Sequence, residues 1–68
     1  MVIIMVQNRL KEIRMKEYMM NQKEFASFLE IDFRQYNRYE HSIQPSLEVA
    51  LKMAFKLNKD VKKIFYLD

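Results

Sequence analysis

Two arginines and two side-chain amides lie close together in the segment FRQYNRYE, residues 33–40. Arg34 and Arg38 are one helical turn apart, so in a helix their side chains share a face. The planar fork of an arginine can bond guanine O6 and N7, and an asparagine or glutamine can pair with adenine. This pattern predicts hydrogen bonding to base edges, although two such arginines can also form a solvated face paired with Glu30 or Glu40.

The composition offers little for catalysis or metal binding. The chain has no cysteine, no glycine and one histidine. A thiolate metal site, a glycine-rich phosphate loop and a nucleophile–histidine pair therefore lack their residues. We expect no enzymatic activity, no metal and no cofactor.

The chain has 68 residues, which suits one small domain. A domain of this size buries only about 60% of the surface that its unfolded chain exposes, so helix packing or oligomerisation must stabilise it. The net charge of +3 is a mild excess, compatible with a polyanionic partner. The apolar opening MVIIMV is too short for a membrane span and no basic residue precedes it, as one would in a signal peptide. We expect a cytoplasmic protein.

Apolar spacing and capping residues divide the chain into short helices. Val6, Leu10 and Ile13 follow the helical period, which predicts a first helix over residues 7–17 with Arg14 on a solvent-facing side. Later helices are expected to begin after four residues that favour N-cap positions, namely Asn21, Asp32, Ser46 and Asp60. The predicted helices cover residues 22–29, 33–41 and about 46–57, with a final short helix after residue 60.

The second and third predicted helices are separated by only three residues. A turn as short as residues 30–32 makes the helices cross steeply, and the small side chain of Ala26 suits the crossing point. Tyr36 and Tyr39 share one face of the third helix and are expected to point into the core. The sequence therefore predicts a helix-turn-helix arrangement.

This arrangement resembles the phage repressor and Cro-like, or XRE-type, helix-turn-helix family. The resemblance runs from about residue 8 to residue 67 and depends on an ordered set of segments: NRLKEIR, QKEFASFL, FRQYNRYE, QPSLEVALKMAFKLN and DVKKIFYL. It implies an all-α fold, a compact five-helix bundle of the lambda-repressor-like DNA-binding type over residues 7–68. Residues 1–6 would form an apolar tail or a short strand.

The resemblance also implies roles for individual residues. Residues 33–40 form the recognition helix, which enters the major groove of double-stranded DNA. The candidates for base contact are Phe33, Arg34, Gln35, Asn37 and Arg38. Gln22 resembles the family's phosphate-contacting glutamine at a helix N-terminus, where the dipole favours an anion, although a capping role is equally compatible. The weaker candidates for phosphate contact are Lys23, Arg9, Tyr39 and His41.

The chain departs from the family pattern at two places. The family prefers glycine in the interhelical turn, and this chain has Glu30. A left-handed backbone at that residue would cost about 1 kcal/mol. The loop after the recognition helix carries His41-Ser42 in place of the usual Asn-Gly or Arg-Gly.

The function implied by the resemblance is a transcriptional regulator of bacterial or phage type. It would act as a repressor and bind a two-fold operator as a homodimer, because one such module buries only about 600–1,000 Å² on DNA. The candidate dimerisation residues are Ile3, Ile4, Phe65, Tyr66 and Leu67. The alternative is a protein–protein module, such as an antitoxin or anti-repressor, in which Arg34 and Arg38 meet acidic residues of a protein partner.

Overall fold

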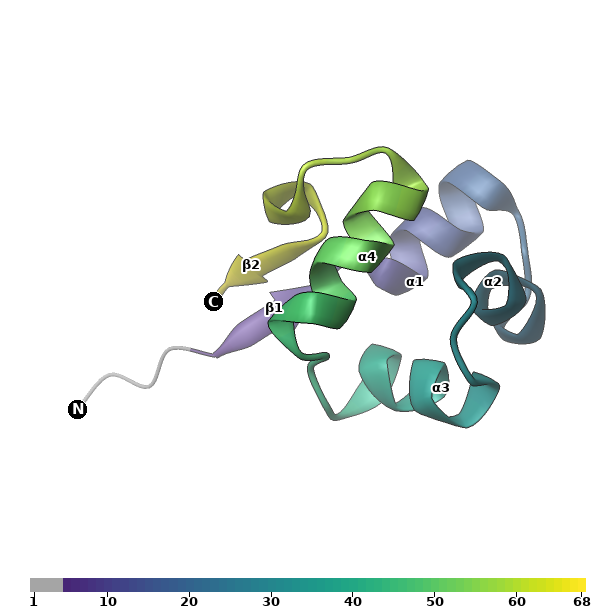
Figure 1. The fold of residues 1–68 in the computed structure, drawn as a ribbon, viewed down its shortest axis with the longest axis horizontal. Coiled ribbons are helices and arrows are strands. Elements are labelled where there is room, and N and C mark those ends of the chain that lie inside the picture. Colours follow the sequence, from purple (N-terminus) through teal and green to yellow (C-terminus); the bar gives the residue numbers. More distant parts are fainter. Residues whose placement is uncertain (1–4) are drawn as a thin grey trace.

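The computed structural model describes residues 5–68, and this part of the chain forms four α-helices and one small sheet (Figure 1). A π-helical segment extends the first helix, and a 3₁₀ turn precedes the second strand. The bounds of the elements are β1 Val6–Asn8, α1 Leu10–Ile13, the π segment Arg14–Tyr18, α2 Gln22–Leu29, α3 Phe33–His41, α4 Leu47–Leu57, the 3₁₀ turn Val61–Lys63 and β2 Phe65–Leu67.

The first and last elements pair as a two-stranded antiparallel sheet (Figure 1). Val6 pairs with Leu67, and Asn8 pairs with Phe65. The expected fifth helix is not found in the described residues, because its segment forms a single 3₁₀ turn and then β2. Aromatic and apolar residues of β2 suit an extended backbone, and β1 supplies partners for its peptide groups. The prediction of an all-α five-helix bundle, with at most a short N-terminal strand, therefore holds only in part.

The first helix begins later than the predicted residue 7. Residues 7 and 8 belong to β1, so their backbone is extended. The Oδ1 of Asn8 accepts a hydrogen bond from the N–H of Leu10 at 3.1 Å, which satisfies one free donor at the start of α1. The π segment ends at Tyr18, and the C-cap residue Met19 has a left-handed backbone with φ of 51°, which stops the helix.

Side chains occupy the N-cap positions of the later helices. Asn21 and Glu24 form a capping box, in which each side chain accepts a hydrogen bond from the N–H of the other residue, at 2.8 and 2.9 Å. The other capping side chains are those of Asp32, Ser46 and Asp60. These caps satisfy N–H groups that a helix leaves free. The start of each of these elements is therefore determined by residues at the start itself.

The turn between α2 and α3 is tight and left-handed. Glu30 has φ of 60°, a region that glycine enters freely and glutamate enters at a cost. The N–H of Ile31 donates to the carbonyl of Ala26 at 2.9 Å, which satisfies a carbonyl at the end of α2. The tight turn between α2 and α3 therefore depends on a residue with a strained backbone.

The core joins all the helices and the end of the 3₁₀ turn. Its largest fully buried side chains are Tyr36, Phe25, Leu10, Met53 and Ile64. The rings of Phe25 and Tyr36 meet edge to face with centroids 5.6 Å apart, which locks α2 against α3. Ala26 is also buried, and its small side chain allows the close approach of α3.

Candidate nucleic-acid interface

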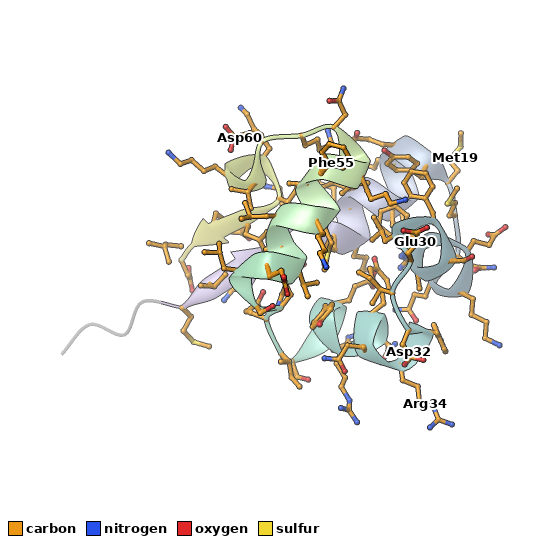
Figure 2. The ribbon with its side chains drawn as sticks, in the orientation of Figure 1. Met19, Glu30, Asp32, Arg34, Phe55 and Asp60 are labelled. Carbon is orange, nitrogen blue, oxygen red and sulfur yellow. The ribbon has the colours of Figure 1, made fainter. Side chains whose placement is uncertain are left out.

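Helix α3 turns one face to the core and the other to solvent. Tyr36 and Tyr39 are 0% and 6% exposed, which confirms the predicted inward face. Arg34 and Arg38 lie on the exposed side, and Figure 2 shows Arg34 extending away from the body of the protein. Within residues 5–68, no hydrogen bond or ion pair engages either guanidinium group. Two cationic forks therefore project into solvent from one helix face.

The carboxylates that could have neutralised these arginines have other partners. Glu30 pairs with Lys56 of α4, with Oε2 and Nζ 3.2 Å apart. Glu40 pairs with Arg14 of the π segment, with Oε2 and Nε 2.8 Å apart. The arginine face of α3 is therefore not a set of intramolecular ion pairs.

Glu40 is the centre of a hydrogen-bond network beneath α3. Its carboxylate accepts hydrogen bonds from Arg14 Nε at 2.8 Å, from Gln22 Nε2 at 3.0 Å and from the hydroxyl of Tyr36. Asn37 Nδ2 donates in turn to Gln22 Oε1 at 2.9 Å. The network connects the π segment, the N-terminus of α2 and α3, so it fixes the orientation of α3.

The network shifts the pKa values of its titratable groups. Burial acts to raise the pKa of Glu40, but hydrogen bonds from Arg14, Tyr36 and Gln22 outweigh it and lower that pKa below its usual value. The hydrogen bond to Glu40 raises the pKa of Arg14. Burial raises the pKa of Tyr36, and its hydrogen bond to Glu40 adds to the effect. At neutral pH the network therefore contains a carboxylate, a guanidinium and a neutral phenol.

A shallow hollow of about 370 Å³ lies between the N-terminus of α2 and the start of α3, lined by Arg14, Asn21, Gln22, Lys23 and Phe33. The Nζ of Lys23 lies 5.6 Å from the centroid of the Phe33 ring. Free N–H groups at a helix N-terminus favour an anion, and the ammonium group of Lys23 adds a positive charge beside them. The hollow thus brings together two candidates for phosphate contact and one for base contact.

Other candidates lie in less favourable places. Gln35 Nε2 donates to the hydroxyl of Tyr39 at 3.2 Å. Tyr39 is itself a core residue, so the expected phosphate contact has little exposed surface to use. The guanidinium carbon of Arg9 lies 4.3 Å from the centroid of the Tyr66 ring, at the sheet. His41 is exposed and is the last residue of α3.

Three of the candidate dimerisation residues, Phe65, Tyr66 and Leu67, form β2. Phe65 is half-buried and packs against the core, whereas Tyr66 and Leu67 are exposed. Ile3 and Ile4 lie outside the described residues, as does most of the apolar tail of residues 1–6.

The prediction that Arg14 lies on a solvent-facing side is wrong, because Arg14 is buried. Its partner Glu40 is 26 positions away, and no local pattern connects the two residues. The available signal was Tyr36, one turn before Glu40, because an inward tyrosine needs a polar partner for its hydroxyl.

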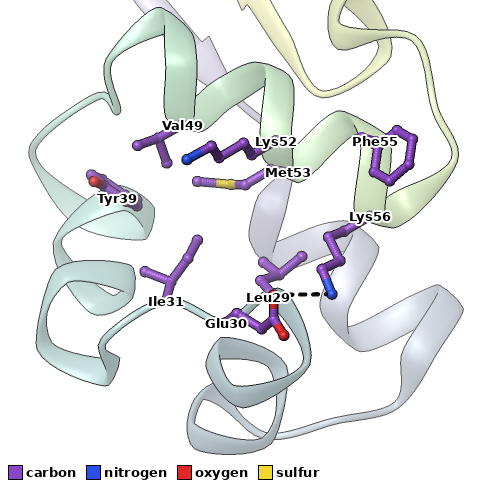
Figure 3. Close-up of a pocket in the computed structure, with 9 residues that line it drawn as sticks. All are labelled: Leu29, Glu30, Ile31, Tyr39, Val49, Lys52, Met53, Phe55 and Lys56. Carbon is purple, nitrogen blue, oxygen red and sulfur yellow. Dashed lines mark ion pairs between the residues drawn. The ribbon is translucent and has the colours of Figure 1, made fainter.

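A second hollow, of about 490 Å³, lies between α4 and the α2–α3 turn (Figure 3). The ion pair of Glu30 and Lys56 closes one edge. The rest of the lining comes from Leu29, Ile31, Tyr39, Val49, Lys52, Met53 and Phe55. Neither this hollow nor any other part of residues 5–68 contains three acidic, histidine or cysteine side chains grouped to hold a metal. No helix in the same range has the length and apolar character needed to cross a membrane.

Two comparisons with known proteins bear on this geometry. The family model described as helix-turn-helix matches residues 10–64, which include every helix and the turn between α2 and α3. No curated protein matches the chain.

Proposed function

Because the chain belongs to the Cro/repressor-like helix-turn-helix family, whose members bind DNA and regulate transcription, we propose that this protein binds a specific two-fold operator as a homodimer and represses transcription there. The observation that carries the proposal is the pair of exposed guanidinium groups, Arg34 and Arg38, on α3. Such a regulator works where the DNA is, so we also place it in the cytoplasm.

The face of α3 supplies the groups that base recognition requires. In the major groove, Arg34 and Arg38 each direct a planar fork toward guanine O6 and N7. Asn37 uses one N–H for Gln22 and keeps its carbonyl oxygen and second N–H for adenine. The ring of Phe33 is partly exposed and suits the methyl group of thymine.

Contacts to phosphate hold α3 in the groove without reading the sequence. The hollow at the start of α2 is the place for one phosphate, with Lys23 supplying charge and Gln22 supplying its remaining N–H. The network around Glu40 joins this hollow to α3, so a phosphate bound at α2 positions the arginines over the bases. Binding of this kind weakens as salt rises, because neutralised phosphates release counterions.

The experiment that tests the function is selection of bound duplexes from a randomised DNA pool. It compares the wild type with Arg34→Ala/Arg38→Ala and with Lys62→Ala/Lys63→Ala. The lysine pair lies on the exposed 3₁₀ turn, so this control loses the same charge away from α3.

The wild type and the lysine control should enrich one two-fold symmetric motif. The arginine variant should lose that motif and keep salt-sensitive binding to bulk DNA. If the wild type enriches no motif, the exposed arginines are ordinary surface and the proposed function is wrong. The protein–protein role considered from the sequence then takes its place.

A further inference from the structure

Helix α4 carries an apolar row that no part of residues 5–68 covers. Leu47, Leu51 and Phe55 follow one another every four residues, so they lie on one face of the helix. They are 72%, 50% and 86% exposed. The neighbouring face of α4 is in the core and consists of Ala50, Met53, Ala54 and Leu57. Single exposed apolar residues are ordinary, but a contiguous row of large ones marks an interaction surface.

One flank of this row carries charges of both signs. Glu48 and Lys52 are one turn apart on α4, and both are exposed. Neither residue belongs to an ion pair of the described chain, in which the lysines paired to glutamates are Lys16, Lys56 and Lys59. The flank therefore has an unpaired anion and an unpaired cation at adjacent positions.

We propose that the row of Leu47, Leu51 and Phe55 is the surface through which two copies of this chain associate, α4 against α4. The inference builds on the proposed function, since it names the interface that a homodimeric operator-binding protein needs. This surface differs from the candidates expected from the sequence, which were Ile3, Ile4, Phe65, Tyr66 and Leu67.

Symmetry argues that the occupant is a second copy. Consider a two-fold axis that passes by Leu51 and runs perpendicular to α4, so that the two helices are antiparallel. Leu51 then meets its own copy, and Leu47 lies beside Phe55 of the second copy. The same rotation keeps each flank on its own side, so Glu48 faces Lys52 of the second copy, and this pair forms twice. The face is thus complementary to itself, as a two-fold interface must be.

Helix geometry supports the same arrangement. Residues spaced by four form a ridge, and two such ridges interlock in the commonest class of helix packing, with axes about 8–10 Å apart. Phe55, at one end of the row, lies far from Arg34 of α3, because Figure 2 shows Phe55 in the upper part of the view and Arg34 at the bottom. At the sheet, in contrast, Tyr66 already packs against Arg9.

Sedimentation equilibrium without DNA tests the interface. The wild type should be a dimer at micromolar concentration. Leu51→Glu places two carboxylates on the axis and should raise the dimer dissociation constant at least about tenfold, the effect expected at the centre of an interface. Leu67→Glu, an equally drastic change at an exposed residue of β2, should leave the dissociation constant unchanged. Circular dichroism shows whether each variant remains helical, and both sites are exposed enough to tolerate the change.

A charge exchange tests the antiparallel arrangement. Lys52→Glu puts Glu48 opposite a carboxylate of the second copy and should weaken the dimer. Glu48→Lys/Lys52→Glu restores opposite charges across the axis and should return the dissociation constant to near the wild-type value. If the double variant is as weak as the single variant, the antiparallel arrangement is wrong.

Two further outcomes would contradict the proposed interface. In the first, the wild type stays monomeric at roughly 100 μM. In the second, Leu67→Glu dissociates the dimer and Leu51→Glu does not. Failure of the proposed function has a different signature. In that case the α4 variants behave as described, but the intact dimer enriches no motif from the DNA pool.

Discussion

The Nε of Arg14 lies 2.8 Å from Oε2 of Glu40, and this ion pair joins the first helical segment to α3. The side chains of the two residues are only 10% and 1% exposed. A buried pair of this kind need not exceed an apolar pair in stability, but the loss of one partner leaves an uncompensated charge in the core. The position of α3, the helix proposed to recognise DNA, therefore depends on a buried ion pair on its core-facing side.

Replacement of Glu40 by alanine should destabilise the fold strongly. The variant leaves Arg14 buried without its carboxylate, and we expect a loss of about 3–5 kcal/mol in the free energy of unfolding. Urea denaturation followed by circular dichroism measures the change. Glu12→Ala is the matched control, because its pair with Lys16 is exposed and should contribute less than about 1 kcal/mol. Equal losses in the two variants would contradict a special role for the buried pair.

Stability should decrease in acid because the pKa of Glu40 is lowered by folding. A lowered pKa means that the folded state favours the carboxylate over the acid. This contribution is complete above the ordinary glutamate value of 4.5 and is lost as the pH falls through the lower pKa of the folded state. Urea midpoints measured between neutral and acidic pH should decline less for Glu40→Gln than for the wild type. If the urea midpoints of the two proteins decline in parallel, other carboxylates cause the loss of stability in acid.

Arg34 and Lys23 should affect DNA binding in different ways. Arg34→Ala should cost about 1–3 kcal/mol at the operator and relax the preference at one base pair. Lys23→Ala should weaken binding to every sequence. It should also reduce the slope of the logarithm of the binding constant against the logarithm of the salt concentration by about one. Fluorescence anisotropy with the operator and a scrambled duplex, at several salt concentrations, separates the two effects. The assignment of Arg34 to base contact fails if its variant weakens both duplexes equally.

Met19 should be a site where glycine stabilises the protein. Its backbone is left-handed, with φ of 51°, and its side chain is exposed, so the methionine bears a conformational cost with little burial in return. Met19→Gly removes that cost, and we expect a gain of about 1 kcal/mol after the greater freedom of glycine in the unfolded chain is counted. In a domain of this size the thermal midpoint should rise by about 4–8 °C. Met19→Ala keeps the left-handed strain, so its thermal midpoint should not rise above that of the wild type.

Much of the candidate site could be predicted because its signals are local. A capping residue acts on N–H groups two or three positions away, so Asn21 and Asp32 mark the starts of α2 and α3 in the sequence itself. The helical period likewise separates the inward Tyr36 from the outward Arg34 within one segment. These signals were enough to indicate a helix-turn-helix and the residues on its exposed face.

The remaining features depend on contacts between distant segments. Pairing of β1 with β2 turned an expected helix into a strand, because backbone partners from the other end of the chain outweighed a weak local preference. Arg14 became a core residue only because α3 brings Glu40 to it. By itself the sequence determined where α2, α3 and α4 start and which face of α3 is polar, since those properties act over a few residues. Only the tertiary structure decided which polar groups are neutralised inside and which apolar row, on α4, remains uncovered, since burial depends on the path of the whole chain.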